Sequence, residues 1–335
     1  MKLKPSLCGS LGVVIFGAMA VMLPAAASAH GLIGQRFLPA TLTIDDPFVA
    51  DELSLPTVSR FRTPASGDKP AQWETNTSAE FSKRLTPDLG LSLGGTWTAI
   101  SPDDEKSVTG FDNLEVALKY VFFKNAQHET LVSAGLGWDV GGTGDKRKVD
   151  AERFDTVTPG LFFGKGFGDL PDQVEMLKPL ALTGAFGLAI PTRRITKTHT
   201  IDDDTGNPIV DREVNASRVN WGFSLQYSLQ YLQSRVRDFG LGAPFNRMIP
   251  IVEFAMQTPI NDPENSGRTT GTINPGIIWF GRYVQLSIEA QLPVNDRTGK
   301  NVGVIGQVHF YLDDIAPKIF SWTPFHGVLG PTQPR

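Results

Sequence analysis

Alternation of large apolar and small polar residues is the dominant pattern of this chain. Between Trp221 and Tyr231, large apolar side chains occupy every second position, and glycine, serine and glutamine fill the positions between them. A period of two over this length predicts a β-strand with one apolar and one polar face. The segments 73–81, 113–122 and 284–292 show the same alternation.

Weaker alternation extends the series to eleven strands from residue 72 onward. It predicts strands near 89–100, 129–140, 154–166, 178–190, 248–260, 269–280 and 301–312. Short links at 85–88, 124–128 and 281–282 alternate with long polar links at 101–110, 141–153, 191–217, 261–268 and 294–300. Medium links at 167–177 and 234–247 fall on the side of the short ones. Transmembrane barrels keep short turns in the periplasm and long loops outside.

This order of links requires one more strand at the beginning. The first of the eleven strands must run inward from outside, so an earlier strand has to carry the chain outward. The segment 51–62 is the candidate, although Pro56 cannot donate a ladder hydrogen bond. The sequence therefore predicts an all-β fold, a closed antiparallel transmembrane β-barrel of about twelve strands with both ends in the periplasm.

Aromatic residues provide a check that is independent of loop length. In this topology Trp73, Trp97, Trp138 and Trp221 lie near the outer strand ends, and other aromatics lie near the periplasmic ends. Two such belts are typical of a spanning barrel. Trp138 has the wrong parity for a lipid-facing residue unless a bulge shifts it. A soluble sandwich or lipocalin-type barrel would alternate in the same way, but the belts and the strand number favour the membrane.

The N-terminus predicts export. Lys2 and Lys4 precede an apolar run over 11–23 and the small-residue pattern Ala27-Ser28-Ala29, which together predict a signal peptide over 1–29. The organisation is then 30–50 as a periplasmic lead-in or plug, 51–313 as the barrel, and 314–335 as a periplasmic C-terminal tail. The expected location is the cell outer membrane. The expected partners are outer-membrane lipid, a small-molecule solute and the barrel-assembly machinery during biogenesis.

Charge and cysteine content narrow the options further. The formal net charge is −4 with both signs scattered along the chain, which argues against a nucleic-acid partner. Cys8 is the only cysteine and lies in the predicted signal peptide, so no disulfide is expected in the mature chain.

The register predicts which polar side chains line the pore. They share inward parity on the predicted strands, where acids, bases and amides pair with one another or form a path for a solute. The predicted pore-lining residues are Glu74, Glu80, Glu115, Lys119, Gln226, Gln230, Glu253, Gln285, Glu289, Gln307 and His309.

Catalytic and metal sites are not expected. The sequence contains no nucleophile elbow, zinc-protease motif or phosphate-binding glycine loop. His309 and Glu289, on adjoining strands, could form an acid–base pair, but a structural hydrogen bond is the more common role for such a pair. His30 at the expected mature N-terminus could chelate copper with His128 or His326. No spacing fixes a second ligand, so we predict no catalytic residue, no metal and no cofactor.

The segment 41–52 contains Asp45, Asp46, Asp51 and Glu52 around Pro47-Phe48. These oxygen ligands could bind calcium. Their spacing matches no known calcium loop, and a lead-in or plug is the better interpretation.

The C-terminal strands carry a resemblance to a known family. The pattern VQLSIEAQLP over 284–293, followed by a polar loop and VGVIGQVHFYLD over 302–313, resembles the outer-membrane transporters grouped with the meta-pathway of phenol degradation. The resemblance implies a channel or transporter for small solutes, including hydrophobic or aromatic compounds. One departure is that 23 residues follow Leu312, so the chain does not end on its last strand.

Three classes of function stay open at this point. A channel or transporter is favoured by the polar lumen. A barrel enzyme would need a tight acid–base constellation. A structural or adhesive barrel would act through external loops, of which 191–217 is the longest.

Overall fold

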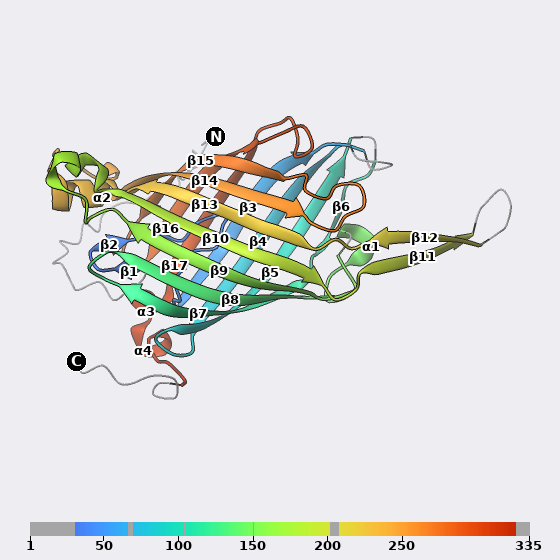
Figure 1. The fold of residues 1–335 in the computed structure, drawn as a ribbon, viewed down its shortest axis with the longest axis horizontal. Helices are drawn as coiled ribbons and strands as arrows, with labels where there is room; N and C mark the ends of the chain where they lie inside the picture. Colours follow the sequence, from blue (N-terminus) through green and yellow to red (C-terminus); the bar gives the residue numbers. More distant parts are fainter. Residues whose placement is uncertain (1–30, 66–69, 104, 150, 202–207, 326–335) are drawn as a thin grey trace, which may run out of the picture.

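Twelve long antiparallel strands form a closed barrel, as the sequence predicts. The computed structural model describes residues 31–65, 70–103, 105–149, 151–201 and 208–325. Each barrel strand pairs with the next one along the chain, and β3 pairs with β17 to close the ring (Figure 1). The barrel strands are β3 (Glu52–Thr63), β4 (Gln72–Arg84), β5 (Leu89–Pro102), β7 (Leu114–Asn125), β8 (Thr130–Val140), β9 (Thr156–Gly166), β10 (Leu180–Pro191), β13 (Arg218–Tyr227), β14 (Met248–Pro259), β15 (Thr270–Phe280), β16 (Val284–Pro293) and β17 (Gly303–Tyr311).

The outer face of the barrel is apolar. On β13, Trp221, Phe223 and Leu225 point outward and are exposed, whereas Ser224 and Gln226 are buried inside. Phe223 stacks on Phe254 of β14 with a centroid distance of 4.4 Å. Large apolar side chains exposed all round a closed barrel require lipid as their surroundings. None of the helices in the described part of the chain is long and apolar enough to cross a membrane.

Trp138 faces outward without any bulge in its own strand, which corrects the parity expected from the sequence. It pairs with the outward-facing Val116 of β7 and is 46% exposed. The register shift lies in β7 instead, between Val121 and Phe123. Leu131 of the same strand is also a large apolar residue, but it faces inward and is fully buried, so the large apolar residues of β8 do not share one face.

The strand predicted over 221–231 runs four residues too far. Strand β13 ends at Tyr227, and the Ser228 hydroxyl accepts a hydrogen bond from the Tyr231 backbone N–H, which caps the short helix α2 (Leu229–Tyr231). Gln230 is therefore exposed on a helix rather than inside a strand. Pro56 lies in β3 where the pairing with β4 shifts between Ser54 and Thr57.

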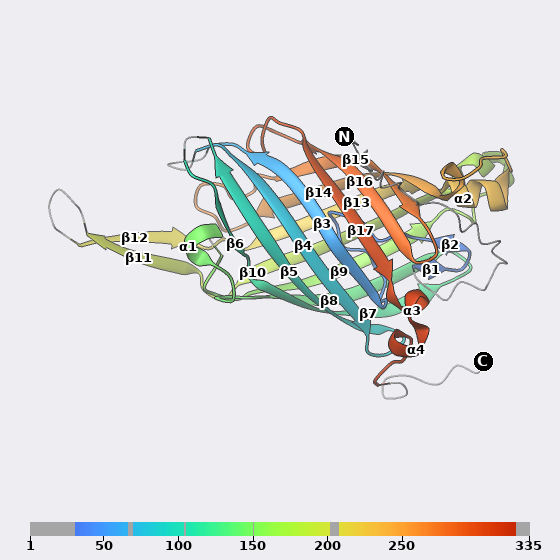
Figure 2. The same cartoon turned by 180° about the vertical axis from the view of Figure 1, so that it is seen from behind.

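The links contain more structure than expected. The 191–217 link forms a hairpin of β11 (Ile195–Ile201) and β12 (Pro208–Val214), which projects beyond the barrel (Figures 1 and 2). The 101–110 link leads into β6 (Val108–Phe111), which pairs with β5, and α1 (Lys146–Val149) lies beside it. At the opposite end are η1 (Asp172–Leu177), η2 (Leu232–Val236) and η3 (Phe245–Arg247).

The C-terminal segment packs beside the end of the barrel that carries the short turns. It contains α3 (Leu312–Ile315) and α4 (Pro317–Phe320) (Figures 1 and 2). Lys83 of β4 donates hydrogen bonds to the carbonyl oxygens of Phe320 and Trp322 at 2.7 and 2.6 Å. The predicted signal peptide 1–29, His30 and His326 lie outside the described residues.

Candidate functional site: the lumen and its N-terminal segment

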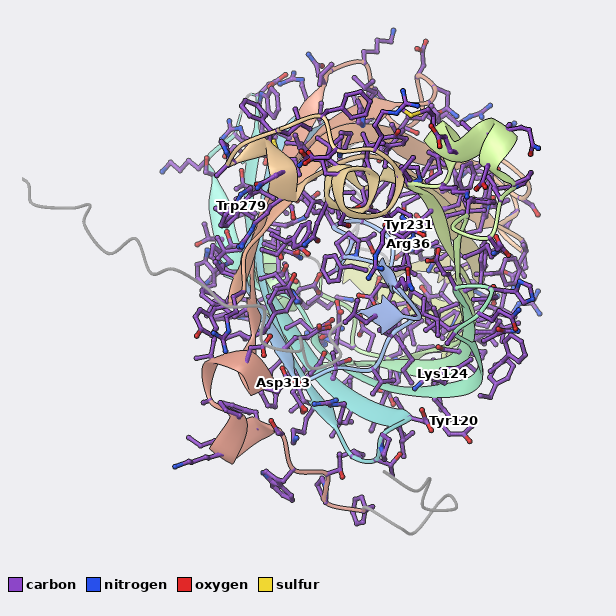
Figure 3. All side chains as sticks on the ribbon, turned by 90° about the vertical axis from the view of Figure 1, so that its left-hand side faces the viewer. Arg36, Tyr120, Lys124, Tyr231, Trp279 and Asp313 are labelled. Atoms are coloured by element: carbon purple, nitrogen blue, oxygen red, sulfur yellow. The ribbon has the colours of Figure 1, made fainter. Side chains whose placement is uncertain are left out.

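Residues 31–50, here called the plug, lie inside the barrel. The strands β1 (Leu32–Ile33) and β2 (Arg36–Phe37) of the plug pair with each other, and both are visible through the end of the barrel in Figure 3. Ile33 and Leu38 pack against the inward-facing Val121 and Leu131. Phe37 packs against a second inward apolar group that includes Phe280, with ring centroids 4.7 Å apart. These apolar contacts hold the plug in the half of the lumen near the short turns.

Arg36 anchors the plug to the barrel. Its guanidinium is fully buried and donates to Glu129 at 3.1 Å, to the Pro179 carbonyl oxygen at 2.9 Å and to the Lys178 carbonyl oxygen. The same group lies 3.7 Å from the centroid of the Tyr231 ring (Figure 3). A planar guanidinium can meet a carboxylate, two carbonyls and an aromatic face at once. The contact with Tyr231 joins the plug to α2.

Glu253 of β14 holds the middle of the plug. Its carboxylate accepts the backbone N–H groups of Leu42 at 2.8 Å, Thr43 at 2.7 Å and Ile44 at 3.2 Å, and also the Thr43 hydroxyl. Gln285 of β16 donates to the Ala40 carbonyl oxygen at 2.8 Å. Two residues predicted to line the pore thus satisfy the backbone of an irregular segment, which would otherwise lack hydrogen-bond partners.

Lys119 of β7 holds the part of the plug around Asp45 and Asp46. Its ammonium group lies 2.6 Å from the Asp45 carboxylate and 2.6 Å from the Asp46 carbonyl oxygen. It also lies 4.8 Å from the Phe162 ring centroid. Gly135 lies opposite Lys119 on β8, which separates β7 from the strand β9 that carries Phe162. A side chain at Gly135 would collide with Phe162. The missing side chain lets the Phe162 ring reach Lys119.

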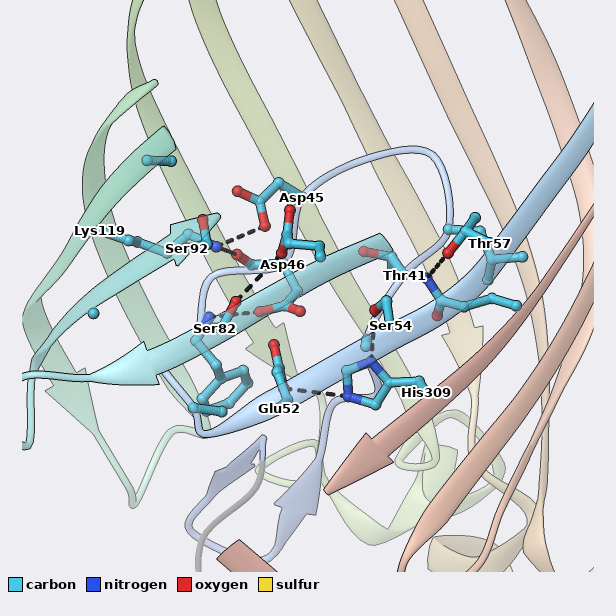
Figure 4. Close-up of a pocket in the computed structure, with 18 of the residues that line it drawn as sticks. Thr41, Asp45, Asp46, Glu52, Ser54, Thr57, Ser82, Ser92, Lys119 and His309 are labelled. Atoms are coloured by element: carbon cyan, nitrogen blue, oxygen red, sulfur yellow. Dashed lines mark hydrogen bonds and ion pairs between the residues drawn. The ribbon is translucent and has the colours of Figure 1, made fainter. Parts of the chain in front are cut away.

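A cavity of about 350 Å³ remains between the plug and the wall formed by β17, β3, β4, β5 and β7 (Figure 4). Hydroxyl groups line it, including those of Ser54, Thr57 and Ser82. Acidic groups dominate its charge. The carboxylates on its lining are those of Asp45, Asp46, Glu52, Glu80 and Glu115, against the cations Lys119 and, when protonated, His309. A second cavity of about 270 Å³ on the other side of residues 43–45 has glycines and Phe162 in its wall.

The predicted pore-lining residues fall into several groups. Glu80, Glu115, Lys119, Gln307 and His309 line the larger cavity. Gln226 is buried in a hydroxyl network, where its amide nitrogen donates to Ser224 at 2.8 Å. Glu74 accepts a hydrogen bond from Asn76 at 2.8 Å, and Glu289 is buried in the wall. Gln230 lies on α2 outside the lumen wall, because the strand ends before it.

His309 does not pair with Glu289. Its Nδ1 lies 2.9 Å from the Ser54 hydroxyl, and its Nε2 lies 3.3 Å from the Glu52 carboxylate (Figure 4). Glu289 lies opposite Ile305 on β17, four residues away from the histidine. Both contacts of His309 run to β3, the strand that closes the barrel, which sequence alternation alone could not identify as its neighbour.

The acidic residues of 41–52 have separate partners rather than one shared ion. Asp45 pairs with Lys119, and Asp51 pairs with Lys83 at 2.6 Å and Arg84 at 2.7 Å. Among the described residues, no group of three or more histidine, cysteine or acidic side chains could hold a metal ion. His128 lies 2.9 Å from Asp169, and hydrogen bonds from His128 and Lys165 lower the pKa of Asp169.

The sequence pattern did not place Arg36, Asp45 and Asp46 of the plug, or Glu52 of β3, in the lumen. The signal for them was the inward parity of Leu131, Ile249, Ile251 and Ile278, which bury large apolar side chains where a solvated lumen needs polar ones. Those apolar positions require a covering segment, and 31–50 supplies it.

No protein-family model and no curated protein matches the chain. An outer-membrane channel from Pseudomonas putida F1 superposes with a TM-score of 0.50 at 12% identity, covering 82% of this chain and 99% of that one. Also similar are a KdgM porin in complex with disordered oligogalacturonate (TM-score 0.41, 9% identity, 76% and 98% coverage) and the β domain of the Bordetella autotransporter BrkA (TM-score 0.44, 14% identity, 78% and 98% coverage). With its apolar outer face, the chain is an outer-membrane β-barrel. Membership of the phenol-degradation family stays a prediction.

Proposed function

We propose that this barrel is an outer-membrane channel for small polar solutes, with a preference for cations. The observation that supports it is the polar wall around the larger cavity, where carboxylates outnumber Lys119 and His309. Low-dielectric walls focus the field of such an imbalance onto a solute. The polar lining favours polar solutes over the hydrophobic or aromatic compounds that the resemblance implies.

Basic residues at the outer end of the barrel oppose this field only weakly. The helix α1 carries Lys146, Arg147 and Lys148, and the last two are exposed. Charges in open solvent are screened over a Debye length of about 8 Å at physiological salt. The enclosed carboxylates are screened less, so they set the selectivity.

The plug makes the proposed channel narrow. It occupies the lumen and leaves separate cavities on its two sides. Solute passage then depends on movement of residues 31–50, which are held mainly by the contacts of Arg36, Glu253 and Lys119. We expect low conductance in the wild type and larger conductance when the plug is released.

Recordings in planar bilayers test the proposal. The purified mature protein should conduct, and its reversal potential across a potassium chloride gradient should show cation preference that strengthens at low salt. A variant lacking residues 31–50 should conduct more and keep the cation preference, because Glu80 and Glu115 belong to the wall. Anion preference would reject the proposed cation selectivity, and no current from the variant without the plug would reject the channel.

A barrel enzyme has one observation in its favour. Ser54, His309 and Glu52 form a chain of hydroxyl, imidazole and carboxylate, the group types of a hydrolytic triad. We propose that this chain instead fastens β17 to β3, since Glu52 and Ser54 occupy the same strand two residues apart. Hydrolysis of an activated ester by the wild type, lost in Ser54→Ala, would support the enzyme instead.

The projecting hairpin is the feature that a structural or adhesive barrel would use. The strands β11 and β12 extend beyond the barrel end (Figure 2). Deleting 196–213 should leave the conductance and selectivity of the barrel unchanged if the lumen carries the function.

A further inference from the structure

Two carboxylates face the larger cavity in one row across the barrel wall. Gly94 of β5 pairs with Glu80 of β4 on one side and with Glu115 of β7 on the other. Its missing side chain leaves the wall between the two acids open, and a Cβ at Gly94 would lie 3.6 Å from the Glu115 carboxylate. The row continues to Ser54 and His309.

Neither carboxylate has an ion-pair partner among the described residues. The Glu80 carboxylate accepts a hydrogen bond from the Ser82 hydroxyl at 3.3 Å. Lys119 lies against Asp45 and the Asp46 backbone instead, and His309 lies against Glu52. Both glutamates are exposed to the cavity. The cavity thus keeps a negative charge after Lys119 has been paired with Asp45 and His309 with Glu52.

One buried acceptor in this wall has no hydrogen-bond partner in the described chain. Gln307 lines the same cavity and is 8% exposed, with its amide nitrogen bonded to Thr57 and its Oε1 without a hydrogen-bond partner in the described chain. Carboxylate and amide oxygens need N–H or O–H donors. An ammonium group offers three donors and a positive charge, so it fits both the charge and the hydrogen-bond chemistry.

The spacing of the two acids suits a ligand with two charges. Glu80 and Glu115 lie two strands apart, so their Cα atoms are separated by roughly 10 Å, twice the inter-strand spacing. An elongated dication can span this separation and place one charge on each acid. We propose that this cavity binds a small aliphatic diamine in its dicationic form, with one ammonium group on Glu80 and the other on Glu115. The inference names a solute class for the proposed channel and rests on that function.

Calorimetry on the purified, detergent-solubilised full mature chain tests the site without requiring current. The probes are 1,4-diaminobutane, butylamine and magnesium ion. The variants are Glu80→Gln, Glu115→Gln and the matched control Glu74→Gln, which removes a charge from the same inward face of β4 outside the cavity lining. Heat-modifiable gel migration shows whether each variant is folded. Because a charge-assisted pair contributes about 1.5–3 kcal/mol, each cavity variant should weaken diamine binding about tenfold or more.

The expected result is that diaminobutane binds more tightly than butylamine or magnesium and that Glu74→Gln binds like the wild type. Equal affinity for the diamine and the monoamine would overturn the two-point site. If Glu74→Gln lost as much diamine affinity as the cavity variants, the binding would depend on the overall negative charge of the lumen, and the two-point site would be overturned as well. Cation-selective current with no diamine binding would reject the site and keep the channel, whereas diamine binding without current in the plug-free variant would reject the channel alone.

Discussion

Glu253 of β14 binds Thr43 of the plug twice, through the backbone N–H at 2.7 Å and through the hydroxyl. The same carboxylate also accepts the N–H groups of Leu42 and Ile44. One wall residue thus satisfies three successive backbone donors in a segment that has no regular structure there. Without it those donors would be buried and unpaired, and the segment would not be held in this position.

Replacing Glu253 should therefore release the plug. In Glu253→Ala the loss of several charge-assisted hydrogen bonds should disfavour plug docking by on the order of 3 kcal/mol, which is about a hundredfold in population. Bilayer conductance should rise, and a cysteine placed at Leu42 should react faster with a polar thiol reagent. Glu74→Ala is the matched control, and equal conductance in both variants would show that Glu253 does not hold the plug.

Arg36 provides a second, independent anchor. Its ion pair with Glu129 is buried, and removing one partner of such a pair leaves an uncompensated charge at a cost of about 3–5 kcal/mol. Arg36→Met alone leaves Glu129 as an unpaired buried charge. It should therefore lower the stability toward urea more than the double variant does, in which Arg36→Met is combined with Glu129→Gln. Arg36→Lys should not restore stability, because an ammonium group cannot reproduce the planar contacts with two carbonyls and Tyr231. Equal stability of the single and double variants would contradict a coupled pair.

The barrel itself was predictable because its strands alternate. Eleven of the predicted strands match the observed ones closely. The prediction over 221–231 is wrong only in its last four residues, where Ser228 caps a short helix. Short-range alternation records which face of a strand meets lipid, and each strand carries that information separately. The contacts of the plug depend on residues such as Arg36 and Glu129, which are 93 positions apart, and no local pattern encodes such a pairing.

The sequence predicted that the pore-lining residues face inward, but not what each of them contacts. Glu253 and Gln285 bind the plug, whereas Glu80 and Glu115 face a cavity. All four have the same inward parity in the sequence. Their roles differ only because residues 31–50 cover one part of the wall and leave another open.

The two faces of β7 should differ sharply in their tolerance of charge. Leu118 faces lipid near the middle of the strand, and its neighbour Ala117 faces the larger cavity. Leu118→Arg should lower the free energy of unfolding from vesicles by about 2–4 kcal/mol, and Ala117→Arg by much less. Urea titration of the reconstituted barrel measures both. Similar losses would mean that the inward and outward assignments of this strand are wrong.

The contact between the last strand and α3 should depend on pH through Asp313. Arg84 donates to Asp313 at 2.7 Å and to Asp51 at 2.7 Å, so one guanidinium serves two buried carboxylates. Burial raises the pKa of Asp313 to about 6, and the nearby Asp51 adds to this effect while Arg84 opposes it. A raised pKa means that the folded chain holds the proton more tightly than the unfolded chain does. Its contribution to stability is therefore complete below about pH 4 and is lost as pH rises through about 6.

Docking of α3 should accordingly weaken between about pH 4 and pH 7, by on the order of 1–3 kcal/mol, because each unit of pKa shift corresponds to about 1.4 kcal/mol. Hydrogen exchange of the amides over 312–320, corrected for the intrinsic effect of pH, measures this directly. In Asp313→Asn the side chain no longer titrates, so protection should change little across the same range. The difference between wild type and variant isolates Asp313 from other titrating groups. Protection that rises with pH in the wild type, or falls equally in both proteins, would show that Asp313 does not control the docking of α3.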